Sequence, residues 1–219
     1  GGIVMANHLQ HIAPKDGTYL GMMPNTLPMA QAVGLEGVRF EAQKFGWLGS
    51  VMPRAHSALI AWAAAGVKSI DDIRKREVSN GASPKGSFTY TMPAMINELL
   101  GAKLKIVAGY QGINPIFLAL ERGEVETVAV TWNDFELEKA DWVRDRKINV
   151  VVQSSPKSPT LPATPAIEDL LTRTSDRALV NLLLSGNAMG RPLAVTPDTP
   201  ADRVSALQGA FEAMRADPI

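Results

Sequence analysis

The sequence contains no cysteine, and its charges cancel, since Lys and Arg number 22 and Asp and Glu also number 22. Without cysteine there are no disulfides, no thiolate catalysis and no cysteine-based zinc site. Without net charge, nothing argues for nucleic acid or an anionic membrane as partner. If the protein binds an anion, local backbone geometry must hold it rather than a basic surface.

Long apolar runs are also lacking. No stretch approaches the roughly 18 apolar residues of a membrane span, and the most apolar one, residues 58–65, is far too short. The chain begins with Gly-Gly, without an initiator Met or a signal peptide, and stops at Ile219 just after a predicted helix. We therefore expect a fragment of a longer protein, whose own ends do not settle its localisation.

What remains is an ordinary globular composition in which helix-like and strand-like segments alternate. The chain is 46% hydrophobic and 20% charged, as is ordinary for a globular protein. Its 219 residues are enough for one large or two small domains. The alternation predicts an α/β fold with largely parallel strands. The strands are expected at 18–23, 45–52, 57–63, 104–108, 125–131 and 148–153, and the clearest helices at 88–100 and 133–146, with a proline-rich loop at 154–165.

Two stretches share one local design. Residues 81–87 follow a short strand and open the helix at 88–100, and residues 109–114 follow the strand at 104–108 and open the next helix. Each turn places free N–H groups and the positive end of a helix dipole at one spot, which favours an anion. Two such turns on consecutive strand–helix units predict a cleft that holds a small anion from two sides.

In the first turn we predict ligand contacts from Ser87 and from the backbone of Gly86 and Phe88. Ser83 lies in the same turn, and Lys85 is expected at the rim, where its charge attracts anions. The alternative is a simple helix cap with no ligand, because serine is a common cap residue.

The second turn contributes Tyr110, Gln111 and Gly112. Tyr110 offers a ring and a hydroxyl and is therefore predicted to contact the ligand or the opposite lobe. The alternative is a turn whose tyrosine packs in the region between the lobes.

Weaker candidates are four polar residues that follow other predicted strands: Asn25, Thr26, Thr131 and Asn133. They are predicted to face the same cleft. Asn25 and Thr26 are equally typical of a turn, and Asn133 of a plain helix cap.

Patterns for catalysis and metal binding are incomplete. Residues 81–86 imitate the start of a P-loop, but Ser87 stands where the phosphate-binding lysine is needed. Ser154 and Lys157 have the Ser-x-x-Lys spacing within a proline-rich loop rather than at a helix start. His8 and His11 lie three residues apart without a third ligand at a recognisable spacing. We therefore predict a protein that is not an enzyme and holds no metal or cofactor.

A set of short motifs stands in an order typical of one family. The motifs are residues 13–21 (APKDGTYLG), 45–50 (FGWLGS), 81–87 (GASPKGS), 100–107 (LGAKLKIV), 109–112 (GYQG), 118–124 (LALERGE) and 200–211 (PADRVSALQGAF). Together they resemble the substrate-binding proteins of tripartite tricarboxylate transporters, also called Bug receptors, over essentially the whole chain.

The resemblance implies a periplasmic-binding-protein fold, with two α/β lobes joined by a two-strand hinge. We expect an incomplete first lobe at 1–103 and 190–219 and a second lobe at 104–189. The family's first strand, its Pro-Gly-Gly turn, the following helix and the next strand lie upstream of Gly1, and a C-terminal segment after Pro218 is also missing.

The same resemblance implies a periplasmic receptor that binds a small organic carboxylate and passes it to a membrane permease. The ligand classes are di- and tricarboxylates, amino acids and aromatic acids, and the sequence does not choose among them. We expect a monomer. Two alternatives stay open: a sensory protein of the same fold, and an α/β enzyme that acts on an anionic substrate.

Overall fold

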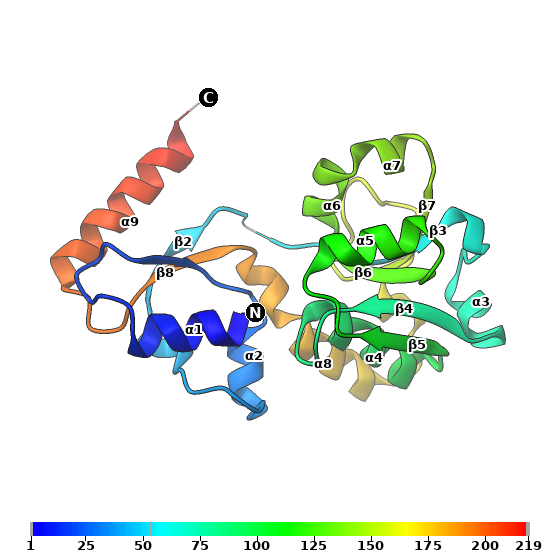
Figure 1. Ribbon diagram of the computed structural model, residues 1–219, viewed down its shortest axis with the longest axis horizontal. Coiled ribbons are helices and arrows are strands. Elements are labelled where there is room, and N and C mark those ends of the chain that lie inside the picture. The colour runs from blue at the N-terminus through cyan, green and yellow to red at the C-terminus, as the bar shows by residue number, and fades with distance from the viewer. Residues whose placement is uncertain (1, 53, 218–219) are drawn as a thin grey trace. The chain divides into compact units, whose positions relative to one another are not determined.

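The chain is described here from a computed structural model, which covers residues 2–52 and 54–217 (Figure 1). It divides into two compact units. Unit 1 comprises residues 1–55 and 185–219, and unit 2 is the continuous segment 56–184. The first lobe was expected to include residues 1–103. Residues 56–103, which were expected in that lobe, belong instead to unit 2.

The physical reason for the difference is strand pairing. The expected boundary fell between two strands that pair in parallel along their whole length, Val78–Ala82 and Leu104–Ala108. Breaking the chain there would separate hydrogen-bonded neighbours of one sheet. Sequence periodicity identifies strands, but it does not show which strands pair.

Unit 1 is built from a three-stranded sheet and three α-helices among its described residues. Its elements are α1 (Gly2–His11), β1 (Leu20–Met22), α2 (Leu27–Ala32), η1 (Ala42–Lys44), β2 (Gly46–Ser50), η4 (Ser185–Met189), β8 (Pro192–Val195) and α9 (Ala201–Ala216). The strand order is β1-β8-β2, and both pairs are antiparallel.

Unit 2 has a five-stranded sheet with helices on both faces. Its strands are β3 (Ser57–Trp62), β4 (Val78–Ala82), β5 (Leu104–Ala108), β6 (Thr127–Thr131) and β7 (Ile148–Gln153). Its helices are η2 (Ala63–Ala65), α3 (Ile70–Lys75), α4 (Phe88–Leu100), α5 (Ile113–Glu121), α6 (Trp132–Glu138), α7 (Ala140–Arg144), η3 (Ile167–Leu170) and α8 (Thr174–Leu183).

The sheet of unit 2 has the order β5-β4-β6-β3-β7. β4 is parallel to β5 and β6, whereas β3 is antiparallel to both of its neighbours. The expectation of largely parallel strands therefore holds for one side of this sheet and is wrong for unit 1. Alternation of helices and strands does not reveal an antiparallel strand that enters the sheet from the opposite edge.

Local sequence signals place the helices that matter for the site. α4 runs over residues 88–100, as its apolar spacing predicted, and ends at Gly101 in the left-handed conformation (φ 63°). α3 begins with a capping box between Ser69 and Asp72. The single helix expected at 133–146 is instead two, because α6 ends at Glu138 and α7 begins at Ala140.

Two separate cores cover the two faces of the unit 2 sheet. α4 packs with Leu59, Ala61 and Ala129 in one core, while α5 packs with Ile60 and Val128 in the other. Successive residues of a strand point to opposite faces. α4 and α5 therefore lie on opposite faces of the same sheet, and each directly follows one of two neighbouring strands, β4 and β5.

Candidate functional site

The neighbouring strands β4 and β5 end at the same edge of the unit 2 sheet, where Ala82 pairs with Ala108. From this edge the chain leaves β4 for α4 on one face and leaves β5 for α5 on the other face. In open α/β sheets, ligands usually bind beyond the carboxyl ends of the strands where the chain makes such a reversal. The two predicted turns lie on either side of this point.

The first turn joins β4 to α4 and presents backbone donors. Gly86 adopts φ 86°, which a residue with a side chain rarely does, and Ser87 is the N-cap of α4 without capping it through its side chain. Within the described part of the chain, the N–H groups of Gly86, Phe88 and Thr89 have no acceptor in the protein. These groups are available to an anion.

The second turn joins β5 to α5 and has the same character. Gly112 is the N-cap of α5 with φ 104°, and it has no side chain with which to cap the helix. The N–H groups of Ile113 and Asn114 also lack an acceptor among the described residues. The predicted turns therefore lie side by side in unit 2 and not in separate lobes.

Two hydrogen bonds connect the turns directly. The carbonyl oxygen of Ala82 accepts from the N–H of Gly109 at 3.0 Å and from the N–H of Tyr110 at 3.2 Å. Because Ala82 is the last residue of β4, the start of the second turn is tied to the start of the first. The donors of both turns are thus held by the sheet and not by mobile side chains.

The side chains of the turns are mostly peripheral. Lys85 and Gln111 are exposed, whereas Ser83 and Phe88 are half-buried. The half-buried Tyr110 packs against the core beneath α5, and its contact with a ligand stays a prediction. The backbone is therefore the main contribution of both turns, and Ser87 provides a half-buried hydroxyl.

Thr131 and Asn133 lie at the same edge, because β6 is parallel to β4. Thr131 is the N-cap of α6 and forms no capping hydrogen bond through its side chain. Asn133 is not a cap. Its side-chain oxygen accepts from the N–H of His56 at 2.7 Å, and the N–H of Trp132 donates to the oxygen of His56. Asn133 therefore fastens the start of β3 to the end of β6.

Asn25 and Thr26 lie in unit 1, in the connection between β1 and α2. Thr26 is the N-cap of α2 without a side-chain cap, and the backbone of Asn25 lies so close to Gly186 that a Cβ there would stand 2.1 Å from the Asn25 oxygen. Both residues form a tight turn, and their role toward a ligand stays a prediction.

Sequence reasoning missed two residues at this edge. Thr89 binds the first turn through its hydroxyl, accepting from the N–H of Ser83 at 2.9 Å. His56 precedes the antiparallel strand β3, which starts where β4 and β6 end, and its Nδ1 lies 3.1 Å from the oxygen of Pro156. A Ser-Phe-Thr sequence at the helix start was the available signal for Thr89; nothing in the sequence marked His56.

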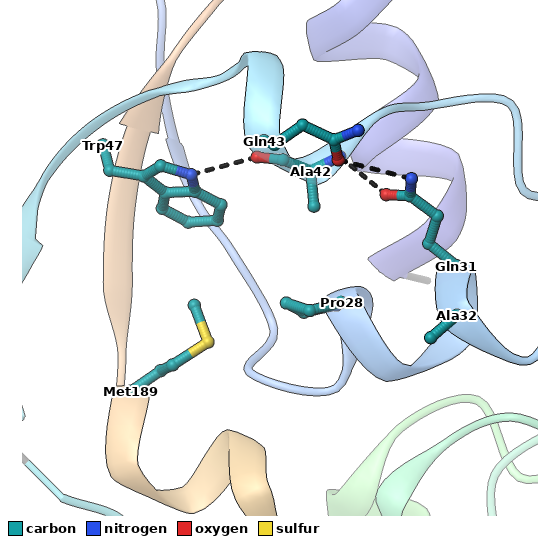
Figure 2. Close-up of a pocket in the computed structure, with 7 residues that line it drawn as sticks. All are labelled: Pro28, Gln31, Ala32, Ala42, Gln43, Trp47 and Met189. Atoms are coloured by element: carbon teal, nitrogen blue, oxygen red, sulfur yellow. Dashed lines mark hydrogen bonds between the residues drawn. The ribbon is translucent and has the colours of Figure 1, made fainter.

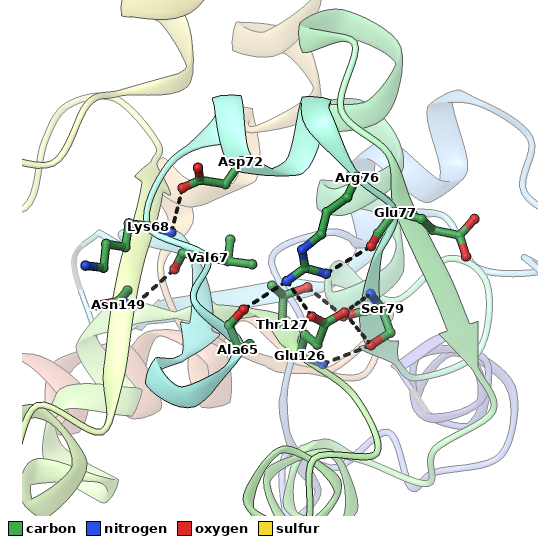
Figure 3. A network of polar contacts seen from close by, with 10 residues as sticks. All are labelled: Ala65, Val67, Lys68, Asp72, Arg76, Glu77, Ser79, Glu126, Thr127 and Asn149. Atoms are coloured by element: carbon green, nitrogen blue, oxygen red, sulfur yellow. Dashed lines mark hydrogen bonds and ion pairs between the residues drawn. The ribbon is translucent and has the colours of Figure 1, made fainter.

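A polar network lies at the other end of the same strands (Figure 3). Arg76 pairs with Glu126 at 2.7 Å, and Glu126 also accepts from the N–H and the hydroxyl of Ser79. Burial raises the pKa of Glu126, but the hydrogen bonds from Arg76 and Ser79 outweigh it and bring the pKa below its ordinary value. Glu126 is thus a paired, ionised residue that joins β4 to β6.

Unit 1 contains a separate open pocket of about 440 Å³ (Figure 2). It is lined by Pro28, Gln31, Ala32, Ala42, Gln43, Trp47 and Met189, none of which carries a charge. Its polar groups bind one another, since Trp47 donates to the oxygen of Ala42 and Gln31 accepts from the N–H of Ala42. The lining offers no cation to an anionic ligand.

Among the described residues, no group of three His, Cys, Asp or Glu side chains could hold a metal ion. The Ser-x-x-Lys pattern lies in the loop after β7, where Lys157 pairs with Asp169 at 3.0 Å. Over residues 2–52 and 54–217, the structure contains no helix with the length and apolar character of a membrane span.

Comparison with known proteins identifies the fold. No protein-family model and no curated protein matches the sequence. Among solved structures, the periplasmic binding protein BugD is 19% identical with a TM-score of 0.72, the match covering 100% of this chain and 70% of BugD. MatC from Rhodopseudomonas palustris, solved with bound malate, is 18% identical with a TM-score of 0.68, over 98% of this chain and 70% of MatC.

A second R. palustris protein, solved with adipate, is 17% identical with a TM-score of 0.70, over 99% of this chain and 69% of its own. The chain thus has the α/β fold of periplasmic binding proteins, which confirms the predicted fold class. BugD bears the name of the family that the sequence motifs resemble.

Proposed function

We propose that this chain is the ligand-binding part of an extracytoplasmic solute receptor that captures a small organic carboxylate and delivers it to a membrane permease. The observation that carries the proposal is the pair of helix-opening turns at the carboxyl ends of β4 and β5, with free N–H groups on both. The malate and adipate bound to proteins of the same fold support the ligand class. A periplasmic location and a permease partner follow from the family resemblance.

The turns suit a carboxylate for a physical reason. An ionised ligand loses hydration when it binds, and preformed donors replace the lost water at little cost in conformational entropy. Each charge-assisted hydrogen bond contributes on the order of 1.5–3 kcal/mol. The donors on Gly86, Phe88 and Ile113 belong to a hydrogen-bonded sheet edge, so their positions do not depend on side-chain rotamers.

An enzymatic role is weaker because the turns supply no histidine or carboxylate for acid–base catalysis. Their polar side chains are hydroxyls, amides and the exposed Lys85. His56 lies at the same sheet edge, but its backbone and ring are both engaged in holding neighbouring segments. We therefore propose binding without turnover.

Isothermal titration calorimetry with malate, adipate and the neutral diamide of adipic acid tests the ligand class. We expect at least one acid to bind and the diamide not to bind. If no organic acid in a broader panel binds, or if the diamide binds as tightly as its acid, the proposal is wrong.

Two proline substitutions test the backbone donors themselves. Phe88 and Ile113 are the first residues of α4 and α5, where proline fits a helix but removes the N–H. Ser87 has ψ 154°, which suits a residue before proline. Phe88→Ala and Ile113→Ala are the matched controls, because they remove the same side chain and keep the N–H.

We expect Phe88→Pro and Ile113→Pro each to bind the carboxylate about tenfold more weakly than the matching Ala variant, the size of one charged hydrogen bond. Thermal unfolding of each pair shows whether the helix start is retained. Equal affinities of the Pro and Ala variants would assign the ligand to another surface.

A further inference from the structure

The first turn is fastened by a side chain that the proposed function does not yet use. Thr89, the second residue of α4, accepts a hydrogen bond from the N–H of Ser83 at 2.9 Å through its Oγ1. The same Oγ1 lies 3.0 Å from the Oγ of Ser87. One hydroxyl therefore connects the beginning of the turn with the cap of the helix.

The bond between the two hydroxyls can run in either direction. A hydroxyl donates one hydrogen bond and accepts up to two. The N–H of Ser83 can only donate, so it occupies one acceptor position of Thr89. Thr89 can then donate its hydrogen to Ser87 Oγ, 3.0 Å away, or accept a second hydrogen bond from it. Where Thr89 is the donor, the Ser87 hydrogen is left free to point to another acceptor.

We propose that Thr89 is a positioning residue for carboxylate binding, which fixes the Ser87 hydroxyl as a hydrogen-bond donor to the ligand. The inference rests on the proposed function, since it concerns the same turn. Ser83 donates to Thr89, Thr89 to Ser87, and Ser87 to the carboxylate, so each bond polarises the next in one direction. The arrangement favours a ligand group that accepts hydrogen bonds and disfavours one that only donates.

The anchor beneath Thr89 is rigid. Asn80, fully buried in β4, directs its side-chain N–H groups to the oxygens of Gly81 and, at 3.5 Å, Thr89. Thr127 of β6 in turn donates to Asn80 at 3.2 Å. The backbone of Thr89 is thereby linked to two central strands, and a donor held on such a scaffold keeps its orientation without the ligand.

A double-mutant cycle on the full chain tests the assignment, with malate and adipate as calorimetric probes. Thr89→Val keeps the shape of the side chain and removes the hydroxyl, whereas Thr89→Ser keeps the hydroxyl. We expect Thr89→Val to weaken carboxylate binding about tenfold, as expected for a misdirected charged hydrogen bond. Thr89→Ser is expected to stay within about twofold of the parent chain.

The cycle separates positioning from a structural role. If Thr89 acts through Ser87, Thr89→Val is expected to add less than about twofold in a Ser87→Ala background. A Thr89 that only stabilised the turn would weaken binding by the same factor in both backgrounds, and that result would overturn the assignment. Equal affinity of Thr89→Val and the parent chain would also overturn it. Failure of the parent chain to bind any carboxylate would instead remove the proposed function, and this inference with it.

Discussion

The backbone oxygen of Ala82 accepts a hydrogen bond from the N–H of Tyr110 at 3.2 Å, so the end of one strand holds the turn that follows its neighbour. Ala82 is fully buried and belongs to a strand with partners on both sides. The geometry between the two turns is therefore set by sheet pairing before any ligand arrives. A ligand that meets such donors does not have to order them, which lowers the cost of binding.

The charged network at the opposite edge leads to a prediction about stability and pH. Glu126→Gln keeps an acceptor for Ser79 but removes the charge that pairs with Arg76. The Glu126 side chain is 26% exposed, so water screens the pair in part, and we expect a loss of about 1 kcal/mol in the free energy of unfolding at neutral pH. Urea titrations of both proteins measure the difference.

The sign of the pH dependence follows from the lowered pKa of Glu126. The ionised Glu126 contributes its full share to the free energy of unfolding above the ordinary glutamate pKa of about 4.3. This stabilisation is lost as the pH falls through the lower pKa of the folded state. The parent chain and Glu126→Gln should therefore converge in stability below about pH 4. Glu124→Gln is the control, because Glu124 is 54% exposed in a 3.8 Å pair, and its substitution is expected to change little. A difference that persists in acid would contradict the pairing.

Local signals in the sequence predicted much of the fold and part of the site. The stripe of apolar residues placed α4, and the glycine-rich turns after two strands placed the backbone donors, because both features depend on neighbours in the chain. Strand pairing depends on distant residues, so the sequence did not show that β3 and β4 share a sheet with β5. For the same reason the lobe boundaries differed, and the position of His56 at the site edge could not be foreseen.

Side-chain roles were harder to predict than backbone roles. Asn133 has the residue type of a cap, yet its partner is the N–H of His56, 77 residues away in sequence. Tyr110 packs on the core beneath α5, a contact that the sequence did not indicate. Each of these outcomes requires knowledge of which segment lies opposite, and a single sequence does not contain it.

The proline-rich loop after β7 depends on one buried amide. Gln153 is fully buried, donates to the oxygens of Leu161 and Thr164, and accepts from the N–H of Ser158 at 2.7 Å. Gln153→Leu removes these three hydrogen bonds and leaves the Thr164 oxygen and the Ser158 N–H without a partner among the described residues, whereas the Leu161 oxygen still accepts from the N–H of Thr164. We expect it to lower the free energy of unfolding by about 3 kcal/mol. Denaturant titration measures the loss.

The matched control is Gln208→Leu, whose side chain is exposed and donates one hydrogen bond, to Trp47. It is expected to cost less than about 1 kcal/mol. If both variants lose the same stability, the loop is held by its prolines and not by Gln153.

The contact between α9 and β2 in unit 1 yields a pair of glycine substitutions with opposite expected signs. A Cβ on Gly49 would lie 2.2 Å from the ring of Phe211, which is the buried residue of α9. Gly49→Ala forces the helix away from the strand and also places a side chain at φ 155°, which residues other than glycine rarely adopt. We expect it to cost about 2–3 kcal/mol. Gly209 lies inside α9 with nothing within 4 Å of its missing Cβ, so Gly209→Ala should stabilise the helix by about 0.5–1 kcal/mol.

Circular dichroism during urea unfolding measures both changes, and the sign of each result has a distinct meaning. A loss in Gly49→Ala that Phe211→Ala reduces would show that ring-to-backbone packing holds α9 on the sheet, because removing the ring removes the clash and leaves only the cost of the backbone conformation. A Gly49→Ala protein as stable as its parent would mean that α9 is held elsewhere along its length. A Gly209→Ala protein less stable than its parent would mean that this face of α9 is covered in solution.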